Sequence, residues 1–271
     1  NHNKIIEKID IGGPTLVRGA AKNYYDVTVI TSIGQYADLI NQLKKFKGAT
    51  TLDFRKKLSQ LAFNESAYYD SVIANYFESL TNKNFTDKKI IYGNLIEKLR
   101  YGENPHQISA LYSKNKNFDL KKIHGKHLSY NNYNDIFSAL AISKNFPKNR
   151  GTVIIKHANP CGVSILKNKI DSYKSALECD PISAFGGIVF FNFRVNKNLA
   201  NELCKIFLEV VIANGFEPGA LKLLKLKKNL RVIDSSNFKN NEIFQVNSAE
   251  NSFLIQSKDN ISFKKNNFKI V

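Results

Sequence analysis

Two adjacent side chains, Lys156 and His157, are the residues of this sequence best suited to acid–base chemistry. They open the run 156–162 (KHANPCG), directly after the apolar segment 152–155. A histidine can act as a general base near neutral pH, and a neighbouring cation can stabilise a developing negative charge. The alternative is a solvated lysine beside a packed histidine at a strand end, and the run by itself slightly favours that alternative.

Two further runs concentrate polar chemistry or glycine. Residues 100–107 (RYGENPHQ) combine a guanidinium, a phenol, amides and an imidazole, and residues 180–187 (DPISAFGG) place two glycines directly before an apolar segment. Glycines let backbone N–H groups approach a ligand closely. For the first run a functional loop and a solvated loop explain the pattern equally well. For the second run alone, an ordinary helix-to-strand turn is the better interpretation.

A third glycine-containing run, 10–18 (DIGGPTLVR), lies near the start of the chain. Its Gly-Gly-Pro turn precedes a segment with helical periodicity, and backbone N–H groups at a helix N-terminus bind anions. Arg18 and Lys22 are four residues apart, so they share one face of that helix. An anion site and a capped surface helix explain this pattern equally well.

Metal and disulfide chemistry find little support in the sequence. It contains no HExxH, P-loop or G-x-S-x-G motif and no GxGxxG after a strand. Only His124 and His127 have a spacing that suits a metal, and no partner ligands lie near them, so we expect no metal site. Cys161, Cys179 and Cys204 include no CxxC pair. Three cysteines cannot all pair within one chain, which indicates a reducing compartment.

The net charge is strongly positive. The 271 residues hold 40 Lys+Arg against 23 Asp+Glu, a formal net charge of +17. Such a charge suggests a nucleic-acid surface, but the lysines are scattered and only six arginines can make bidentate contacts. A/T-rich codons also favour Lys, Asn, Ile, Phe and Tyr. We therefore do not expect nucleic acid as the main partner, and a phosphorylated metabolite fits the charge equally well.

The elements that must position these residues begin with a mainly helical part. The patterns predict a short strand at 27–30, an amphipathic helix at 36–45 and two helices within 52–80, broken near Asn64. The polar stretch 81–89 is the best linker candidate. No apolar run is long enough to span a bilayer and no signal peptide is recognisable, so we expect a cytoplasmic protein.

Beyond residue 89, short apolar runs alternate with amphipathic helical segments. This order predicts an α/β fold with a largely parallel sheet. In such sheets the site lies at the carboxyl ends of the strands. Residues 159–162 are predicted to turn there, and so to hold Lys156 and His157 where the chain leaves the core.

Taken together, these runs resemble one family, the bifunctional purine-biosynthesis enzymes that combine 5-aminoimidazole-4-carboxamide ribonucleotide (AICAR) formyltransferase with IMP cyclohydrolase. They occur in the family's order at 10–23 (DIGGPTLVRGAAKN), 66–77 (SAYYDSVIANYF), 99–107 (LRYGENPHQ), 125–132 (GKHLSYNN), 156–162 (KHANPCG) and 180–189 (DPISAFGGIV). Their joint occurrence outweighs the alternatives that each run leaves open by itself.

The resemblance implies an α/β fold in two parts. Residues 1–95 resemble the C-terminal part of a methylglyoxal-synthase-like IMP cyclohydrolase domain. Residues 96–271 resemble the N-terminal half of a formyltransferase domain with cytidine-deaminase-like α/β layers. The start at Asn1 and the absence of methionine suggest an internal piece of a longer protein, roughly its middle half by the resemblance. We therefore expect the piece alone to be inactive or nearly so.

The resemblance also implies two reactions. The transferase moves a formyl group from its co-substrate, 10-formyltetrahydrofolate, to the 5-amino group of AICAR, and the cyclohydrolase closes the product, FAICAR, to IMP with loss of water. The amine is a weak nucleophile, so a base must take its proton, and His157 matches that base. Lys156 matches the group that stabilises the oxyanion or assists the folate leaving group. Asp10 and Lys22 match residues that help close the ring.

Substrate contacts and partners follow from the same resemblance. Phe185 and Gly186 match the loop beside the reacting groups, and Glu209 matches an acidic contact to the substrate. The family's nucleotide-contacting positions match Arg100, Tyr101, His106 and Asn131. The family's transferase site is shared between two subunits, so we expect a homodimer. The competing hypothesis is a non-catalytic remnant that binds nucleotides or nucleic acid.

Overall fold

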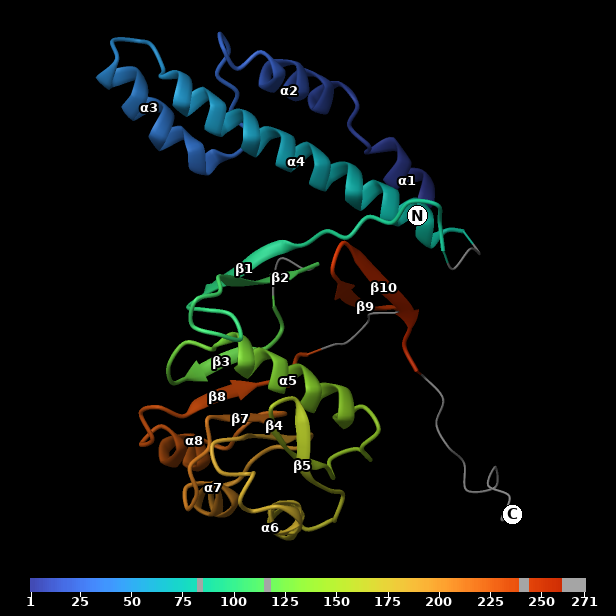
Figure 1. Ribbon diagram of the computed structural model, residues 1–271, viewed down its shortest axis with the longest axis vertical. Helices are drawn as coiled ribbons and strands as arrows, with labels where there is room; N and C mark the ends of the chain where they lie inside the picture. Colours follow the sequence, from blue (N-terminus) through green and yellow to red (C-terminus); the bar gives the residue numbers. More distant parts are fainter. Residues whose placement is uncertain (82–84, 115–117, 239–243, 260–271) are drawn as a thin grey trace. The chain divides into compact units, whose positions relative to one another are not determined.

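The computed structural model describes residues 1–81, 85–114, 118–238 and 244–259. The chain forms two compact units, Asn1–Asn94 and Leu95–Val271 (Figure 1). The predicted linker at 81–89 lies within the first unit, and its residues 82–84 fall outside the described residues. Within the described part of the chain, no helix is both long enough and apolar enough to cross a membrane.

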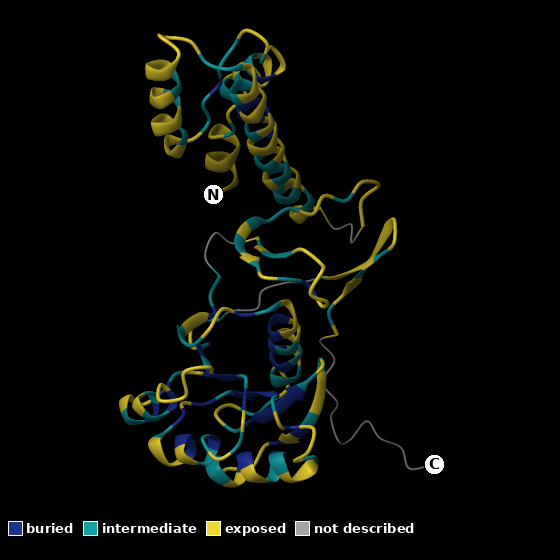
Figure 2. Cartoon of the chain, turned by 60° about the vertical axis from the view of Figure 1, so that its left-hand side comes forward, coloured by how far each residue is buried: buried dark blue, intermediate teal, exposed yellow. Residues whose placement is uncertain are grey.

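The first unit is helical. Its elements are α1 (His2–Glu7), α2 (Gly12–Lys22), the 3-10 helix η1 (Ile33–Gln35), α3 (Tyr36–Lys45) and α4 (Leu52–Ser79). α2 packs on α4 around a small core of Ala21, Val29 and Ala62. α1 and α3 bury no side chain, and most of this unit is exposed or half-buried (Figure 2). The predicted helix at 36–45 is confirmed.

Two predictions for the first unit are wrong. The segment 27–30 belongs to no strand of the structure, because no neighbouring strand in the described part of the unit pairs with it. The two helices expected within 52–80 are the single 28-residue helix α4. No Gly or Pro interrupts α4, and an exposed asparagine such as Asn64 costs a helix only about 0.7 kcal/mol.

The second unit is built on a six-stranded sheet. In spatial order the strands are β3 (Lys121–His124), β8 (Arg231–Asp234), β7 (Val210–Ala213), β6 (Ile188–Phe191), β4 (Thr152–Lys156) and β5 (Asn159–Ser164). Only the β6–β7 and β7–β8 pairs are parallel. The other three neighbouring pairs are antiparallel. The α/β fold is confirmed, but the largely parallel sheet is wrong because the sheet is mixed.

The reversal of chain direction between β4 and β5 explains why the sheet is mixed and not largely parallel. Residues 159–162, predicted to be a turn, open strand β5, and the turn itself is His157–Ala158. Lys156 pairs with Asn159, so only two residues join the strands. A connection this short can join only antiparallel strands, whereas a parallel pair needs a crossover of a dozen or more residues.

Helices cover both faces of the sheet. One face is covered by α5 (Tyr130–Ser143) and the other by α6 (Lys169–Cys179), α7 (Lys197–Leu203) and α8 (Pro218–Leu224) (Figure 1). Val153 and Ile155 of β4 join the α5 core, and Ile154 between them joins the opposite core. This alternation of side chains along each strand divides the core into two layers.

Two pairs of strands lie outside the main sheet. β1 (Asn94–Leu99) pairs with β2 (Ser109–Ser113), and β9 (Phe244–Ala249) pairs with β10 (Ser252–Ser257). The sequence from residue 241 to residue 271 predicts short strands with polar turns, and β9 and β10 agree with this prediction. That prediction also covered residues 241–243 and 260–271, which lie outside the described residues.

Candidate active site

The candidate site lies where the carboxyl end of β4 meets the amino ends of β6 and β7. Ile155 of β4 pairs with Ile188 at the start of β6, because these two strands are antiparallel. Lys156 and His157 therefore stand at a carboxyl end, as predicted, but the parallel strands present their amino ends at this edge. Polar groups that precede β6 and β7 in the sequence are brought here, and groups that follow those strands are not.

Lys156 contacts the glycine-containing loop that precedes β6. Its Nζ atom donates a hydrogen bond to the carbonyl oxygen of Phe185. Gly186 has a φ of 71°, a conformation that favours glycine, and its N–H donates to the Phe207 carbonyl at 2.8 Å. A side-chain carbon at position 186 would lie 3.6 Å from Lys156 Nζ. The structure thus brings together Lys156, Phe185 and Gly186 as a group.

Asp180 shapes the beginning of this loop. Its Oδ1 atom accepts the Ser183 N–H at 2.9 Å, and its carbonyl accepts the Ala184 N–H at 3.1 Å. Hydrogen bonds from Ser183, first from its side chain, lower the pKa of the Asp180 carboxyl. The run 180–187 is therefore a helix-to-strand turn, and it also carries backbone groups to Lys156.

His157 lies at the tip of the β4–β5 turn with an exposed side chain. The φ angles of His157 and Ala158 are 52° and 61°, both in the left-handed region. The Ala158 N–H donates to Oδ1 of Asp135, on α5, at 2.7 Å. Burial raises the pKa of Asp135, although the Ala158 N–H and the charge of His157 act in the opposite direction.

Sequence reasoning missed Asp135. A signal was present, because Asp135 lies four residues after Asn131 and therefore shares its side of a helix. Without the β4–β5 turn in place, nothing linked that helix to His157.

Glu209, directly before β7, is held between two side chains. Asn132 of α5, which is buried, donates from Nδ2 to Glu209 Oε2 at 2.8 Å. Arg231 Nη1 lies 3.5 Å from the same oxygen. Neither residue was a sequence candidate. Arg231 gave no local signal, because it meets Glu209 only through the pairing of β8 with β7.

The run 100–107 forms a loop closed by its last residue. Gly102 N–H donates to the Gln107 carbonyl at 2.8 Å, and Asn104 N–H donates to Gln107 Oε1 at 2.7 Å. The Arg100 guanidinium lies 5.8 Å from the centre of the Tyr101 ring. His106 is exposed.

The start of α5 connects this loop to the rest of the site. Asn131 Nδ2 lies 3.4 Å from the Glu103 carbonyl, Asn132 contacts Glu209 and Asp135 contacts the His157–Ala158 turn. Side chains from the first two turns of one helix thus reach three separate groups of candidate residues.

Asp10 and Lys22, in the first unit, are not brought together. Asp10 precedes α2 and Lys22 is its last residue, which places them roughly 16 Å apart for an 11-residue helix. Asp10 Oδ1 accepts the Gly13 N–H at 3.0 Å, so its carboxylate occupies a position that an anion would take at this helix end. The anion site considered for the Gly-Gly-Pro turn is therefore not supported. Lys22 is exposed.

The family of the chain follows from comparison with known proteins. A family model described as "AICARFT/IMPCHase bienzyme" matches residues 20–271. The chain belongs to this family.

Curated relatives agree with this membership. The chain is 40% identical over 272 residues to the bifunctional purine biosynthesis protein PurH of Clostridioides difficile (strain 630). It is 42% identical over 273 residues to the protein of the same name from Thermoanaerobacter sp. (strain X514). Each match covers 98% of this chain and 53% of the relative. The chain therefore spans about half the length of the curated relatives it matches.

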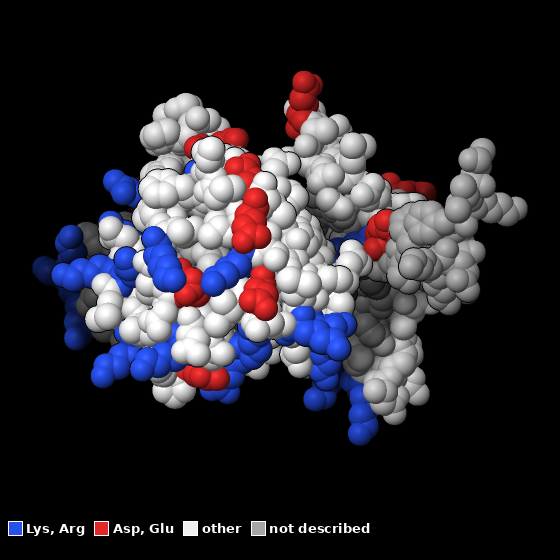
Figure 3. All heavy atoms as spheres, turned by 90° about the horizontal axis from the view of Figure 1, so that it is seen from below, with Lys and Arg blue, Asp and Glu red and all other residues white. Residues whose placement is uncertain are grey.

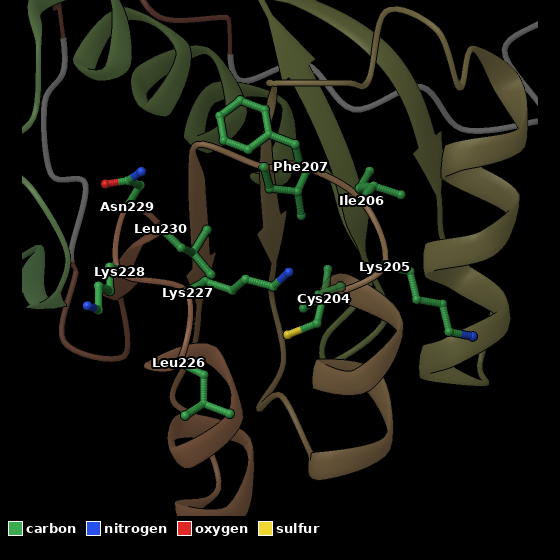
Figure 4. A pocket seen from close by; sticks show the side chains of 11 residues that line it. Cys204, Lys205, Ile206, Phe207, Leu226, Lys227, Lys228, Asn229 and Leu230 are labelled. Carbon is green, nitrogen blue, oxygen red and sulfur yellow. The ribbon is translucent and has the colours of Figure 1, made fainter.

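A cavity in this AICARFT/IMPCHase family member adjoins the candidate site through Phe207. This cavity of about 380 Å³ is lined by Leu203–Leu208 and Leu226–Leu230 (Figure 4). Phe207 belongs to this lining and also contacts Phe185, with ring centres 5.4 Å apart. Burial raises the pKa of Cys204, an effect partly offset by Lys227, whose side chain extends toward it (Figure 4). No sequence motif indicated this cavity.

The surface charge and the metal-ligating side chains of this family member bear on two further kinds of partner, nucleic acid and metal ions. On the face seen in Figure 3, Lys and Arg side chains are dispersed and Asp and Glu lie among them, an arrangement that does not favour a nucleic-acid surface there. Among the described residues, no group of three or more His, Cys, Asp or Glu side chains could hold a metal ion.

Proposed function

We propose that this chain is part of a bifunctional enzyme of purine biosynthesis, which formylates AICAR with 10-formyltetrahydrofolate and closes the resulting FAICAR to IMP. One observation carries the proposal for the second unit: Lys156, its contact loop at Phe185 and Gly186, and Glu209 gather at one edge of the sheet, beside His157. Family membership supplies the reaction class to which this arrangement is suited.

His157 acts as the general base in this proposal. The 5-amino nitrogen of AICAR attacks the formyl carbon of the folate, and His157 takes the proton that the nitrogen must lose. Lys156 stabilises the negative charge on the formyl oxygen or assists the departure of tetrahydrofolate. The Lys156 ammonium donates a hydrogen bond to the Phe185 carbonyl and lies beside Gly186, so contacts with the 180–187 loop fix the position of the cation.

The nucleotide is bound by the loop between β1 and β2. Arg100 and Tyr101 supply a cation and an aromatic ring from adjacent positions, and His106 adds an exposed imidazole. Asn131 reaches the same loop from α5. Glu209 faces the substrate from the sheet edge while Asn132 and Arg231 hold its carboxylate.

The two units are assigned to the two reactions. Residues 1–95 contribute the C-terminal part of the cyclohydrolase domain, and residues 96–271 contribute the N-terminal half of the formyltransferase domain. Asp10 and Lys22 serve ring closure. Because α2 separates them by roughly 16 Å, they act on one substrate only together with further groups. The longer relatives have room for such groups.

The test is His157→Ala in the full natural gene product that contains this chain. We expect formyl transfer to fall by about 100-fold or more, the scale of general-base catalysis, with IMP formation from FAICAR unchanged. The matched control is His124→Ala, which removes an imidazole that hydrogen-bonds to the Lys227 carbonyl and contacts none of the proposed catalytic residues in the structure. Equal loss of both activities in His157→Ala would contradict the assignment of His157 to formyl transfer alone.

Partners and location are part of the same proposal. The enzyme is a homodimer, and sedimentation of the full gene product as a monomer would contradict this. AICAR, FAICAR, IMP and folate are its ligands, and nucleic acid is not its main partner. Three free cysteines are in keeping with the cytoplasm, which is a reducing compartment.

A further inference from the structure

The turn that carries His157 has an unfavourable composition. His157 and Ala158 are the two central residues of the β4–β5 connection, and both have positive φ. Two-residue hairpin turns of this type strongly prefer Asn-Gly, Asp-Gly or Gly-Gly, because side chains other than Asn and Asp are strained in this region. Such strain persists only where the surrounding structure determines the conformation.

Two side chains hold the turn through its backbone. Asn159 Nδ2 donates to the His157 carbonyl at 2.8 Å from within β5. From outside the hairpin, Asp135 Oδ1 accepts the Ala158 N–H at 2.7 Å, and the His157 N–H also interacts with this carboxylate. The Asp135 contact spans 23 residues of sequence and ties the turn to a different element.

Asp135 is itself held firmly in place. It lies in the second turn of α5 and is followed by Ile136, which is fully buried in the core between α5 and the sheet. Among the described side chains, three ionisable groups interact with Asp135: His157, which attracts it, Glu209, which repels it, and the Cys161 thiol, whose pKa the Asp135 charge raises. Placing a half-buried carboxylate next to another carboxylate costs free energy unless it makes hydrogen bonds. Asp135 makes such bonds to the backbone of the His157–Ala158 turn.

We infer that Asp135 is a positioning residue for His157: its carboxylate holds the His157–Ala158 turn in the left-handed conformation and so fixes where the imidazole stands relative to Lys156. This inference rests on the proposed function. Asp135 does not touch the reacting atoms. It acts through the backbone, so its removal displaces the base without removing it.

The test compares Asp135→Ala with Asp135→Asn in the full natural gene product. Displacing a catalytic group by about 1 Å can cost up to 100-fold, so we expect Asp135→Ala to lower kcat for formyl transfer about 10- to 100-fold. KM for AICAR stays within about twofold, because uniform binding is untouched. Asp135→Asn keeps kcat within about threefold, because its amide oxygen still accepts the Ala158 N–H.

Two controls accompany these variants. Asn134→Ala, an exposed neighbour on the same helix, leaves both activities unchanged. Binding of AICAR, measured on every variant, reports whether the second unit is folded, and IMP formation from FAICAR reports the same for the first unit. If Asp135→Ala does not fold, Asp135→Glu replaces it, since it keeps the charge but moves the acceptor by one methylene, and a lowered kcat is again expected.

His157→Ala, assayed in parallel, separates the proposed catalytic role of His157 from the positioning role of Asp135. If it retains formyl transfer, the proposed function fails and the inference fails with it. If His157→Ala collapses while Asp135→Ala, or Asp135→Glu in its place, keeps the kcat of the natural protein, only the positioning role is overturned. If Asp135→Asn is as slow as Asp135→Ala, charge and not the hydrogen bond is what matters, and the inference as stated is wrong.

Discussion

The pKa values of two carboxyl groups of this protein, Asp135 and Asp180, are shifted in opposite directions. Burial dominates at Asp135 and raises its pKa, whereas at Asp180 hydrogen bonds from Ser183 dominate and lower the pKa. The two carboxyl groups therefore contribute to the pH dependence of folding stability with opposite sign. Protonation favours the folded state at Asp135 and opposes it at Asp180.

Asp135 yields a prediction about the pH dependence of stability. Because its folded-state pKa is raised, its carboxyl contributes stability that is fully present below the ordinary aspartate value near 4 and is lost as pH rises through the raised value. Asp135→Asn cannot titrate. We expect the melting temperature of the natural protein to fall relative to this variant as pH rises from 4 to 7. A difference between the two proteins that is constant across that range would contradict the assignment.

At the scale of elements, the contact between β5 and α6 depends on one residue without a side chain. Gly162 is buried in β5, and a Cβ atom there would overlap the backbone carbonyl of Ala176 in α6. Both partners are backbone, so neither can rotate away. The close approach of strand and helix is thus possible only with glycine.

The corresponding prediction concerns Gly162→Ala. We expect it to destabilise the protein by about 1–3 kcal/mol, the usual cost of overpacking, because β5 and α6 must separate. Denaturant unfolding checks this. The matched control is Gly219→Ala in α8, where the nearest atom to the new Cβ would be the Lys197 side chain at 3.6 Å, an ordinary contact. Equal stability of the two variants would rule out the clash.

At the scale of the whole molecule, the two units have unequal cores. The second unit buries two apolar layers around its sheet, whereas the apolar side chains that the described part of the first unit buries are Ala21, Val29, Leu58 and Ala62. Three helices of the first unit, α1, η1 and α3, bury no side chain. The chain covers 53% of each of the two bifunctional purine biosynthesis proteins compared above. The first unit also separates its two proposed ring-closing residues.

We therefore predict that the 271-residue chain by itself performs neither reaction at a measurable rate. Formyl transfer is assayed with AICAR and 10-formyltetrahydrofolate, and cyclisation with FAICAR, each against the full natural gene product. Binding of AICAR to the isolated chain is the control that its second unit is folded. Turnover by the isolated chain in either assay would show that its own residues complete a site.

The local sequence was enough to predict several elements of the second unit. The apolar runs at 152–155, 187–193 and 210–212 predict strands, and the structure has β4, β6 and β7 there with buried apolar side chains. The alternation of such runs with helices predicted the α/β class. Lys156 and His157 were found because chemically suited residues directly follow such a strand. Helix caps, turns and apolar periodicity depend on residues that are close in the sequence. Helices and strands can therefore be predicted from these patterns without knowledge of the fold.

Only the tertiary structure decided the directions of the strands and the partners of the site residues. The β4–β5 reversal makes the sheet mixed and turns the amino ends of β6 and β7 toward Lys156. Asp135 meets the His157 turn across 23 residues, and Arg231 meets Glu209 across 22. Such contacts form only when whole helices and strands pack together. The energy of that packing depends on segments far apart in the sequence, so no short-range sequence pattern predicts these contacts.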